Sequence, residues 1–237
     1  MNDADTNLAL VLDQVAFHWA GRDAFGLRVP DFRIAQGERV LLLGESGSGK
    51  STLLSLICGI NAPQNGSIRV DGTEISVMRP AARDRFRAES IGIVFQQFNL
   101  LPYASPIDNI LLPLRFAPAR RARAGDARAA ALDLTDALGL SRDIILSSTA
   151  DRLSVGQQQR VAVARALIGA PSLIVADEPT SALDAGAQAS FLDLLFAQCA
   201  AAGSTLLMVS HDERLAPRFD RSVRMEDIAV LTREAAA

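Results

Sequence analysis

The sequence Gly44-Glu45-Ser46-Gly47-Ser48-Gly49-Lys50-Ser51 fits the pattern G-x-x-x-x-G-K-[ST]. It stands between a dense apolar run, Arg39–Leu43, and a segment with helical apolar spacing, Ser51–Ile60. This order predicts a buried parallel strand, a glycine-rich loop and a helix. Backbone N–H groups of such a loop wrap around a phosphate, and the helix start adds the positive end of its dipole. We therefore expect Lys50 to reach the β- and γ-phosphates of a nucleotide and the Ser51 hydroxyl to bind Mg²⁺.

Lys50 is also unusual in the composition of the chain. Of the 24 basic residues, Lys50 is the one lysine and the rest are arginines. A compact ammonium and a planar guanidinium bind anions differently. A single lysine at this position therefore indicates a task that arginine does not perform.

Strands and helices alternate around this loop. Strands are expected before it, at Leu8–Trp19 and Phe25–Ile34 with a turn at Gly21–Asp23, and after it, at Ile91–Phe95, Leu173–Ala176 and Thr205–Val209. Helices are expected at Gln157–Ile168 and Ala185–Ala202. This alternation predicts an α/β fold with a mainly parallel sheet, which binds ligands at the carboxyl ends of its strands.

The stretch from Phe98 to Arg152 differs in character. It is rich in Ala and Leu with helical spacing and is interrupted by prolines, so we expect a helical subdomain inserted into the α/β core. Its basic patch, Arg120-Arg121-Ala122-Arg123, is interpreted as a solvated helix face.

Composition excludes several classes of protein. The chain has 237 residues, 49% of them hydrophobic, and a net charge of −3, which gives no broad electrostatic reason to bind nucleic acid. No apolar run reaches the roughly 18 residues of a membrane span, and Met1–Asp5 lacks the form of a signal peptide. Cys58 and Cys199 have no metal-binding spacing and are expected to be buried, as in a reducing cytoplasm.

Two further segments carry chemistry. Asp177 and Glu178 end an apolar strand, where Asp177 is suited to hold Mg²⁺ through water and Glu178 to orient an attacking water. The segment Leu153-Ser154-Val155-Gly156-Gln157 precedes a helix. Ser154 can cap that helix and Gly156 permits close approach of an anion, so the segment is either a second phosphate site or an ordinary capped helix.

With these motifs the chain resembles the ATP-binding subunit of an ABC transporter over nearly its whole length. Residues 44–51 resemble the family's Walker A motif, 173–178 its Walker B strand, and 153–157 its signature motif, in which Val155 replaces the first glycine. Gln96 stands at the Q-loop glutamine, Ser181 to Asp184 at the D-loop, His211 at the switch histidine and Trp19 at an adenine-stacking aromatic.

The resemblance implies a fold and roles for these residues. It implies a RecA-like P-loop NTPase fold with an N-terminal antiparallel β subdomain. One ATPase domain would span 1–237, with core and β subdomain in 1–96 and 157–237 and the helical subdomain in 97–156. ATP would contact Trp19, residues 44–51 and Thr52, and Mg²⁺ would contact Ser51, Gln96 and Asp177. Glu178, His211, Gln96 and Lys50 would be catalytic.

The family's architecture also implies partners. Two subunits would pair head to tail, each offering Ser154, Val155, Gly156 and Gln157 to the ATP on the other, with Ser181 and Asp184 crossing between the sites. A separate membrane permease would dock beside Gln97–Tyr103 and hold the subunit on the cytoplasmic face of the membrane. The alternative for Gln97–Tyr103 is packing within the helical subdomain.

Residues 94–102 and 109–114 resemble the lipoprotein-releasing and macrolide-efflux branch, whose ATPases transmit motion across the membrane. Three alternatives stay open: a solute importer, such as one for amino acids, a cell-division regulator, and a soluble ABC ATPase of DNA repair or translation. The sequence identifies neither the substrate nor the permease. It leaves open whether a periplasmic adaptor and an outer-membrane channel take part, and how Val155 affects turnover.

Overall fold

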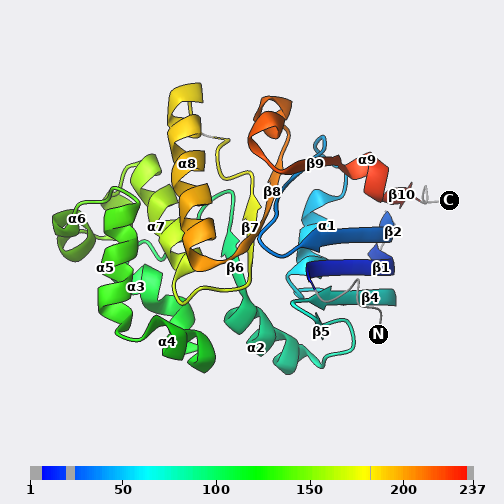
Figure 1. Ribbon diagram of the computed structural model, residues 1–237, viewed down its shortest axis with the longest axis horizontal. Helices are drawn as coiled ribbons and strands as arrows, with labels where there is room; N and C mark the ends of the chain where they lie inside the picture. Colours follow the sequence, from blue (N-terminus) through cyan, green and yellow to red (C-terminus); the bar gives the residue numbers. More distant parts are fainter. Residues whose placement is uncertain (1–6, 20–24, 182, 234–237) are drawn as a thin grey trace. The chain divides into compact units, whose positions relative to one another are not determined.

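The computed structural model describes residues 7–19, 25–181 and 183–233 (Figure 1). Contacts divide the chain into two compact units. Unit 1 consists of Met1–Arg87 and Thr205–Ala237, and unit 2 of Ala88–Ser204. The predicted turn at Gly21–Asp23 lies outside the described residues.

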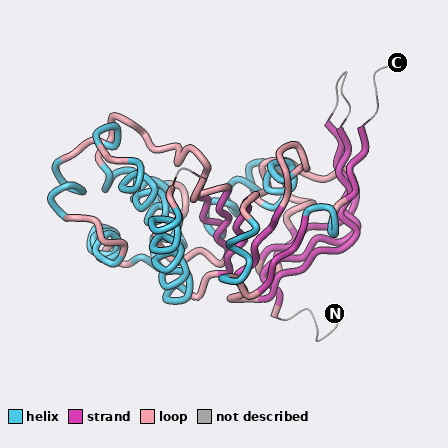
Figure 2. The backbone as a smooth tube through the Cα atoms, turned by 90° about the horizontal axis from the view of Figure 1, so that it is seen from above, coloured by secondary structure: helices cyan, strands magenta, loops and turns pink. Residues whose placement is uncertain are grey.

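Unit 1 contains an antiparallel sheet with the strand order β10-β2-β1-β4-β5. Its strands are β1 (Leu8–Trp19), β2 (Phe25–Ala35), β4 (Asn65–Val70), β5 (Thr73–Glu74) and β10 (Val230–Arg233). The register of β1 on β2 runs from Leu8 opposite Ala35 to Trp19 opposite Phe25. Adjacent strands of this sheet are visible as side-by-side magenta tubes in Figure 2. The predicted strands before the phosphate-binding loop are therefore confirmed as a hairpin in an antiparallel sheet.

Unit 1 also contains three parallel strands. Strand β3 (Arg39–Leu43) lies between β8 (Thr205–Ser210) and β9 (Arg221–Arg224) and pairs with both in parallel. Helix α1 (Lys50–Ile57), the 3₁₀ helix η4 (Glu213–Arg218) and helix α9 (Met225–Ile228) complete the unit. The carboxyl ends of β3 and β8 share an edge, so the loop after Leu43 and the segment after Ser210 begin at the same edge.

Unit 2 holds a parallel strand pair, β6 (Ile91–Val94) and β7 (Leu173–Asp177), and most of the helices. These are α3 (Pro106–Leu111), η2 (Leu112–Arg115), α4 (Pro118–Ala124), α5 (Ala127–Ala137), α6 (Arg142–Ser147), η3 (Ala150–Arg152), α7 (Val155–Leu167) and α8 (Ala185–Ala202). Helix α2 (Pro80–Ser90) contains the boundary between the units. The pairs β3–β8, β3–β9 and β6–β7 are all parallel, which confirms the predicted α/β class.

The ends of the longer helices follow from capping residues. The side chain of Ser154 accepts from the Gln157 N–H at the start of α7, and Asp184 accepts from the Ala187 N–H at the start of α8. Helix α8 ends at Gly203, whose φ of 64° lies in the left-handed region that favours glycine.

The structure corrects one sequence interpretation and confirms another. At the start of the stretch expected to form a helical subdomain, Phe98 and Asn99 take left-handed backbone angles, and the first helix of that stretch starts at Pro106. Arg120 is not solvated, since its side chain is only 2% exposed. Cys58 and Cys199 are buried, as predicted. Within the described ranges no helix is both long and apolar enough to cross a membrane.

Candidate nucleotide-binding and hydrolysis site

The loop that follows β3 has a shape that requires glycine. Gly47 and Gly49 have φ angles of 81° and 89°, in the left-handed region. A side chain at Gly49 would also meet Leu231 at 3.1 Å and Phe25 at 3.2 Å. The loop closes with a hydrogen bond from the Ser48 N–H to the Glu45 carbonyl (3.2 Å), and α1 begins directly after it.

The donors of this loop fit a polyphosphate. Lys50 is 8% exposed, and its Nζ donates to the carbonyls of Gly44 (2.6 Å) and Glu45 (2.7 Å). Among the described residues, the Oγ of Ser48 is the one buried side-chain polar atom without a hydrogen-bond partner. An ammonium, an unsatisfied hydroxyl and the start of α1 therefore converge on one loop, which is the donor set that phosphate oxygens require.

Trp19 lies beside the first turn of α1. Its Nε1 donates to the Thr52 Oγ1 at 3.2 Å, and its ring meets Phe17 edge-on at 5.1 Å between centroids. The indole is 46% exposed. A half-exposed aromatic ring held next to the phosphate-binding loop is suited to stack on a base.

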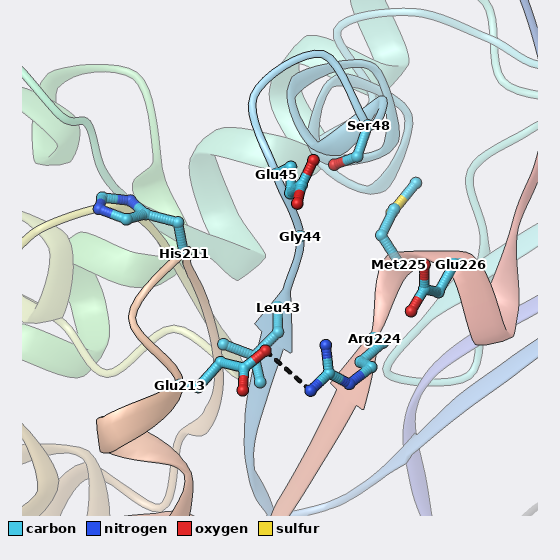
Figure 3. Close-up of a pocket in the computed structure, with 9 residues that line it drawn as sticks. All are labelled: Leu43, Gly44, Glu45, Ser48, His211, Glu213, Arg224, Met225 and Glu226. Carbon is cyan, nitrogen blue, oxygen red and sulfur yellow. Dashed lines mark ion pairs between the residues drawn. The ribbon is translucent and has the colours of Figure 1, made fainter.

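His211 lies on the opposite side of the loop from Met225, as Figure 3 shows. A cavity of about 390 Å³ is lined by Leu43, Gly44, Glu45, Ser48, His211, Glu213, Arg224, Met225 and Glu226. An ion pair between Arg224 and Glu213 (2.7 Å) borders it. Unit 1 thus brings His211 and the glycine-rich loop after β3 to one cavity.

The two acidic residues of unit 2 follow β7. Asp177 is its last residue, and Glu178 comes next with a φ of 43°, a left-handed angle in a residue other than glycine. Such an angle costs of order 1–3 kcal/mol and is found preferentially at functional sites. The Glu178 carbonyl accepts from the Ser181 N–H at 3.2 Å, so the strand turns sharply there.

The signature segment forms the start of α7. Ser154 and Gln157 make a reciprocal capping box, in which the Ser154 N–H also donates to Gln157 Oε1 at 2.9 Å. Val155 is 51% exposed, and a side chain built on Gly156 would meet no atom of the chain within 4 Å. The segment therefore forms the capped helix start that was one of the two sequence interpretations. The surface at Val155 and Gly156 is not covered by described residues.

The remaining predicted residues also lie in unit 2. Gln96 is exposed in the turn after β6. Ser181 is exposed, Asp184 caps α8, and Ala182 between them lies outside the described residues. The described residues contain no cluster of three or more His, Cys, Asp or Glu side chains suited to a metal ion. The Ser51 hydroxyl in unit 1 and the Asp177 carboxylate in unit 2 are each an oxygen donor of the kind that Mg²⁺ binds together with phosphates and water.

Sequence reasoning missed two buried polar residues of α7. Gln159 Nε2 donates to the Pro179 carbonyl at 2.6 Å, directly after Glu178. Arg165 donates to the carbonyls of Phe98 and Asn99, directly after the Q-loop. The sequence hints at their burial only through the apolar residues Val161, Ala162 and Ala166 of the same helix, which are buried in the structure.

The comparisons with known proteins agree with this geometry. Residues 27–181 match the family described as ABC transporter. The chain is 41% identical over 197 residues to the lipoprotein-releasing system ATP-binding protein LolD of Syntrophotalea carbinolica, covering 83% of this chain and 85% of LolD. It is 40% identical to the macrolide export ATP-binding/permease protein MacB of Rhodopirellula baltica, covering 82% of this chain and 28% of MacB.

A solved structure extends the likeness to the fold. It is a dimeric ATP-binding cassette in a post-hydrolysis state with ADP and Pi, 33% identical, with a TM-score of 0.77 over 91% of this chain and 93% of that one. The chain therefore belongs to the ABC transporter family and is an ABC ATPase, similar in sequence to the ATP-binding proteins of lipoprotein release and macrolide export.

Proposed function

We propose that two copies of this chain bind two ATP molecules and drive a separate membrane permease of the lipoprotein-release or macrolide-efflux type. Each ATP is held between residues 44–52 of one copy and Ser154–Gly156 of the other. The observation that carries this proposal is the open start of α7, where a Cβ added to Gly156 would meet no described atom within 4 Å apart from the adjacent residues and the nearby backbone of its own helix. The dimeric relative bound to ADP and Pi supports the pairing, and the similarity to LolD and MacB supports the branch.

Each residue then has a defined task. Trp19 stacks on the base, while Lys50 and the N–H groups of residues 47–51 hold the phosphates. Glu178 orients the attacking water and accepts its proton, and His211 and Gln96 contact the terminal phosphate. Ser51, Asp177 and Gln96 hold Mg²⁺, which neutralises phosphate charge when bound. Ser181 and Asp184 lie at the interface between the two copies.

The permease places the subunit on the cytoplasmic face of the membrane. The described surface of unit 2 includes Tyr103, 78% exposed, and Phe116, 67% exposed, which suit a contact with another protein. Phe98 instead is buried, so the predicted docking segment Gln97–Tyr103 is apolar partly for packing.

A trapped variant tests the proposal. Glu178→Gln keeps the site but removes the proton acceptor, so tagged protein should remain as an ATP-bound dimer on its permease. Membranes of the native host are solubilised in Mg-ATP, the tag is pulled down and partners are identified by mass spectrometry. The matched control adds Lys50→Ala, which should abolish ATP binding and with it the capture.

The partner identifies the branch. A permease with about four spans and a large periplasmic domain supports the proposal, and any periplasmic adaptor would appear with it. A many-span permease with a solute-binding protein would make this chain an importer ATPase.

A further inference from the structure

Two buried carbonyl contacts fasten the carboxyl end of α7 to the segment after Gln96. Arg165 lies in the last turn of α7 and is 9% exposed. Its Nη1 donates to the Asn99 carbonyl at 2.7 Å and its Nη2 donates to the Phe98 carbonyl. Burial lowers the pKa of Arg165, whereas the negative end of the α7 dipole stabilises its positively charged guanidinium.

The segment that Arg165 holds has an uncommon backbone. Phe98 and Asn99 have φ angles of 59° and 47°, so two consecutive residues other than glycine lie in the left-handed region. A left-handed conformation is unfavourable for a residue other than glycine, and it persists only where surrounding contacts hold it. Here it directs two successive carbonyls at one guanidinium.

The other end of α7 carries the signature residues. The helix runs from Val155 to Leu167, about 20 Å at 1.5 Å per residue. Near its start, Gln159 is bonded to Pro179 after Glu178. One helix thus contacts the segment after the Q-loop near its carboxyl end and has Ser154–Gly156 at its amino end.

We propose that Arg165 is a positioning residue that couples the segment after Gln96 to helix α7, so that a displacement of the Q-loop also displaces Ser154–Gly156. This inference rests on the proposed function for its consequence, because a displacement of Ser154–Gly156 changes ATP-driven dimerisation only if these residues contact ATP on a second copy. Among the described residues, the Arg165 guanidinium donates to the backbone carbonyls of Phe98 and Asn99, so it responds to the backbone path of these residues and not to their side chains.

The chain offers a matched control on the same helix. Arg160 Nη1 donates to the carbonyls of Leu138 and Gly139, after α5, and its guanidinium forms no hydrogen bond to the described residues 96–99. Arg160→Gln therefore removes a guanidinium and two carbonyl contacts from α7 but leaves the Q-loop link intact. Arg165→Lys keeps the positive charge, but its ammonium can donate to only one of the two carbonyls at a time.

Dimerisation measures the coupling. In the Glu178→Gln background, ATP-driven dimerisation is followed by analytical ultracentrifugation. We expect Arg165→Gln to weaken dimerisation about tenfold, which is the size of effect expected from the loss of a charge-assisted hydrogen bond. Dimerisation of Arg165→Lys should lie between that of Arg165→Gln and that of the parent. Dimerisation of Arg160→Gln should stay within about twofold of the parent. ATP affinity of the free subunit, read from Trp19 fluorescence, should stay within about twofold for all three variants. Equal dimerisation of Arg165→Gln and Arg160→Gln would overturn the proposal.

Combination with Gln96→Ala separates coupling from packing. If Arg165 acts through the Q-loop, Gln96→Ala adds little to the effect of Arg165→Gln; if Arg165 serves packing alone, the two fold-changes multiply. Should Arg165→Gln fail to fold by circular dichroism, Arg165→Lys carries the same comparison.

Hydrogen exchange keeps the proposed function and this inference apart. If the Glu178→Gln parent forms no dimer with ATP, the proposed function fails. The coupling is then measured as the ATP-induced change in hydrogen exchange at residues 97–103 and 154–160. In the parent both segments should change, whereas in Arg165→Gln residues 97–103 should change without residues 154–160. Joint changes in both proteins would contradict the coupling.

Discussion

Gln159 Nε2 donates a hydrogen bond to the Pro179 carbonyl at 2.6 Å, and the Gln159 side chain is 1% exposed. The donor lies on the helix that begins with the signature residues. The acceptor follows Glu178, whose left-handed backbone angle needs support from its surroundings. A buried contact between side chain and backbone therefore links the signature helix to the loop that carries the proposed water-orienting carboxylate.

Gln159→Leu tests this link. Leucine fills a similar volume but leaves the Pro179 carbonyl unsatisfied, which costs about 1–3 kcal/mol of stability. Because the loop after Glu178 loses its support, we expect ATP hydrolysis to fall about tenfold while ATP affinity stays within about twofold. Steady-state phosphate release and calorimetric ATP binding measure the two effects.

A control variant addresses stability alone. Thr135 is fully buried in α5 and its Oγ1 donates to the Leu132 carbonyl at 2.8 Å, away from the proposed site residues in sequence. Thr135→Val should lower the melting temperature without changing turnover per folded molecule. Equal losses of turnover in both variants would refute the link.

Trp19 provides a prediction about the base. Aromatic stacking on a base is worth about 1–3 kcal/mol, so Trp19→Ala should weaken ATP binding roughly tenfold, and Trp19→Phe should lose less. Thr52→Val removes the hydrogen bond to Nε1 but keeps the indole, and its effect should be smaller than that of Trp19→Ala. Titration calorimetry measures the affinities, and wild-type affinity in Trp19→Ala would contradict a stacking role.

The sequence predicted the elements with strong periodicity. The bounds of Leu8–Trp19, Arg39–Leu43 and Ala185–Ala202 agree with the structure, because apolar alternation, a dense apolar run and an Asp cap each mark them locally. Helix α2 escaped prediction because none of its residues is buried, so it has no apolar face. Its Arg83 instead donates to the Gly59 carbonyl at 2.7 Å, a contact between distant positions.

In the candidate site too, local patterns could be predicted from the sequence and contacts between distant positions could not. Residues 44–51 are contiguous and their chemistry follows from order and spacing alone. Gln159 and Arg165 act on carbonyls that lie 20 and 66–67 positions away, so no local pattern reveals their partners. A polar side chain on a helix indicates solvent by default, and only tertiary packing shows that these two are buried.

The Asp220 carboxylate makes the stability of the fold depend on pH. Its carboxylate accepts from the Arg39 N–H (2.9 Å), Nε (3.0 Å) and Nη2 (2.5 Å), joining β9 to β3. The side-chain hydrogen bond from Arg39 is the main reason that the pKa of Asp220 lies below 3.8. Since the folded pKa is depressed, this group stabilises the fold above pH 3.8, and the contribution is lost as pH falls through the folded pKa.

Asp220→Asn should therefore cost about 1 kcal/mol of unfolding free energy at pH 7, a small value because the carboxylate is partly exposed. The difference from wild type should shrink as the pH is lowered below 3.8. Asp31→Asn, which breaks the exposed pair with Arg33, is the control and should change stability little at any pH. A pH-independent difference for Asp220→Asn would contradict the assignment.

Arg120 and Arg121 are neighbours in α4 with opposite environments. Arg120 is 2% exposed and donates to the carbonyls of Ala88, Arg165, Ala166 and Ile168, whereas Arg121 is exposed. Burial lowers the pKa of Arg120 to about 10, so its guanidinium stays charged at neutral pH. The charge is stabilised by these carbonyls, which terminate α7 or precede β6.

Arg120→Met leaves those carbonyls without their donor, so we expect a loss of about 3 kcal/mol or more in unfolding free energy. Arg121→Met should stay within about 0.5 kcal/mol of wild type. Urea unfolding followed by circular dichroism measures both, because the helices of unit 2 dominate that signal. Equal stability of the two variants would restore the interpretation of residues 120–123 as a solvated helix face.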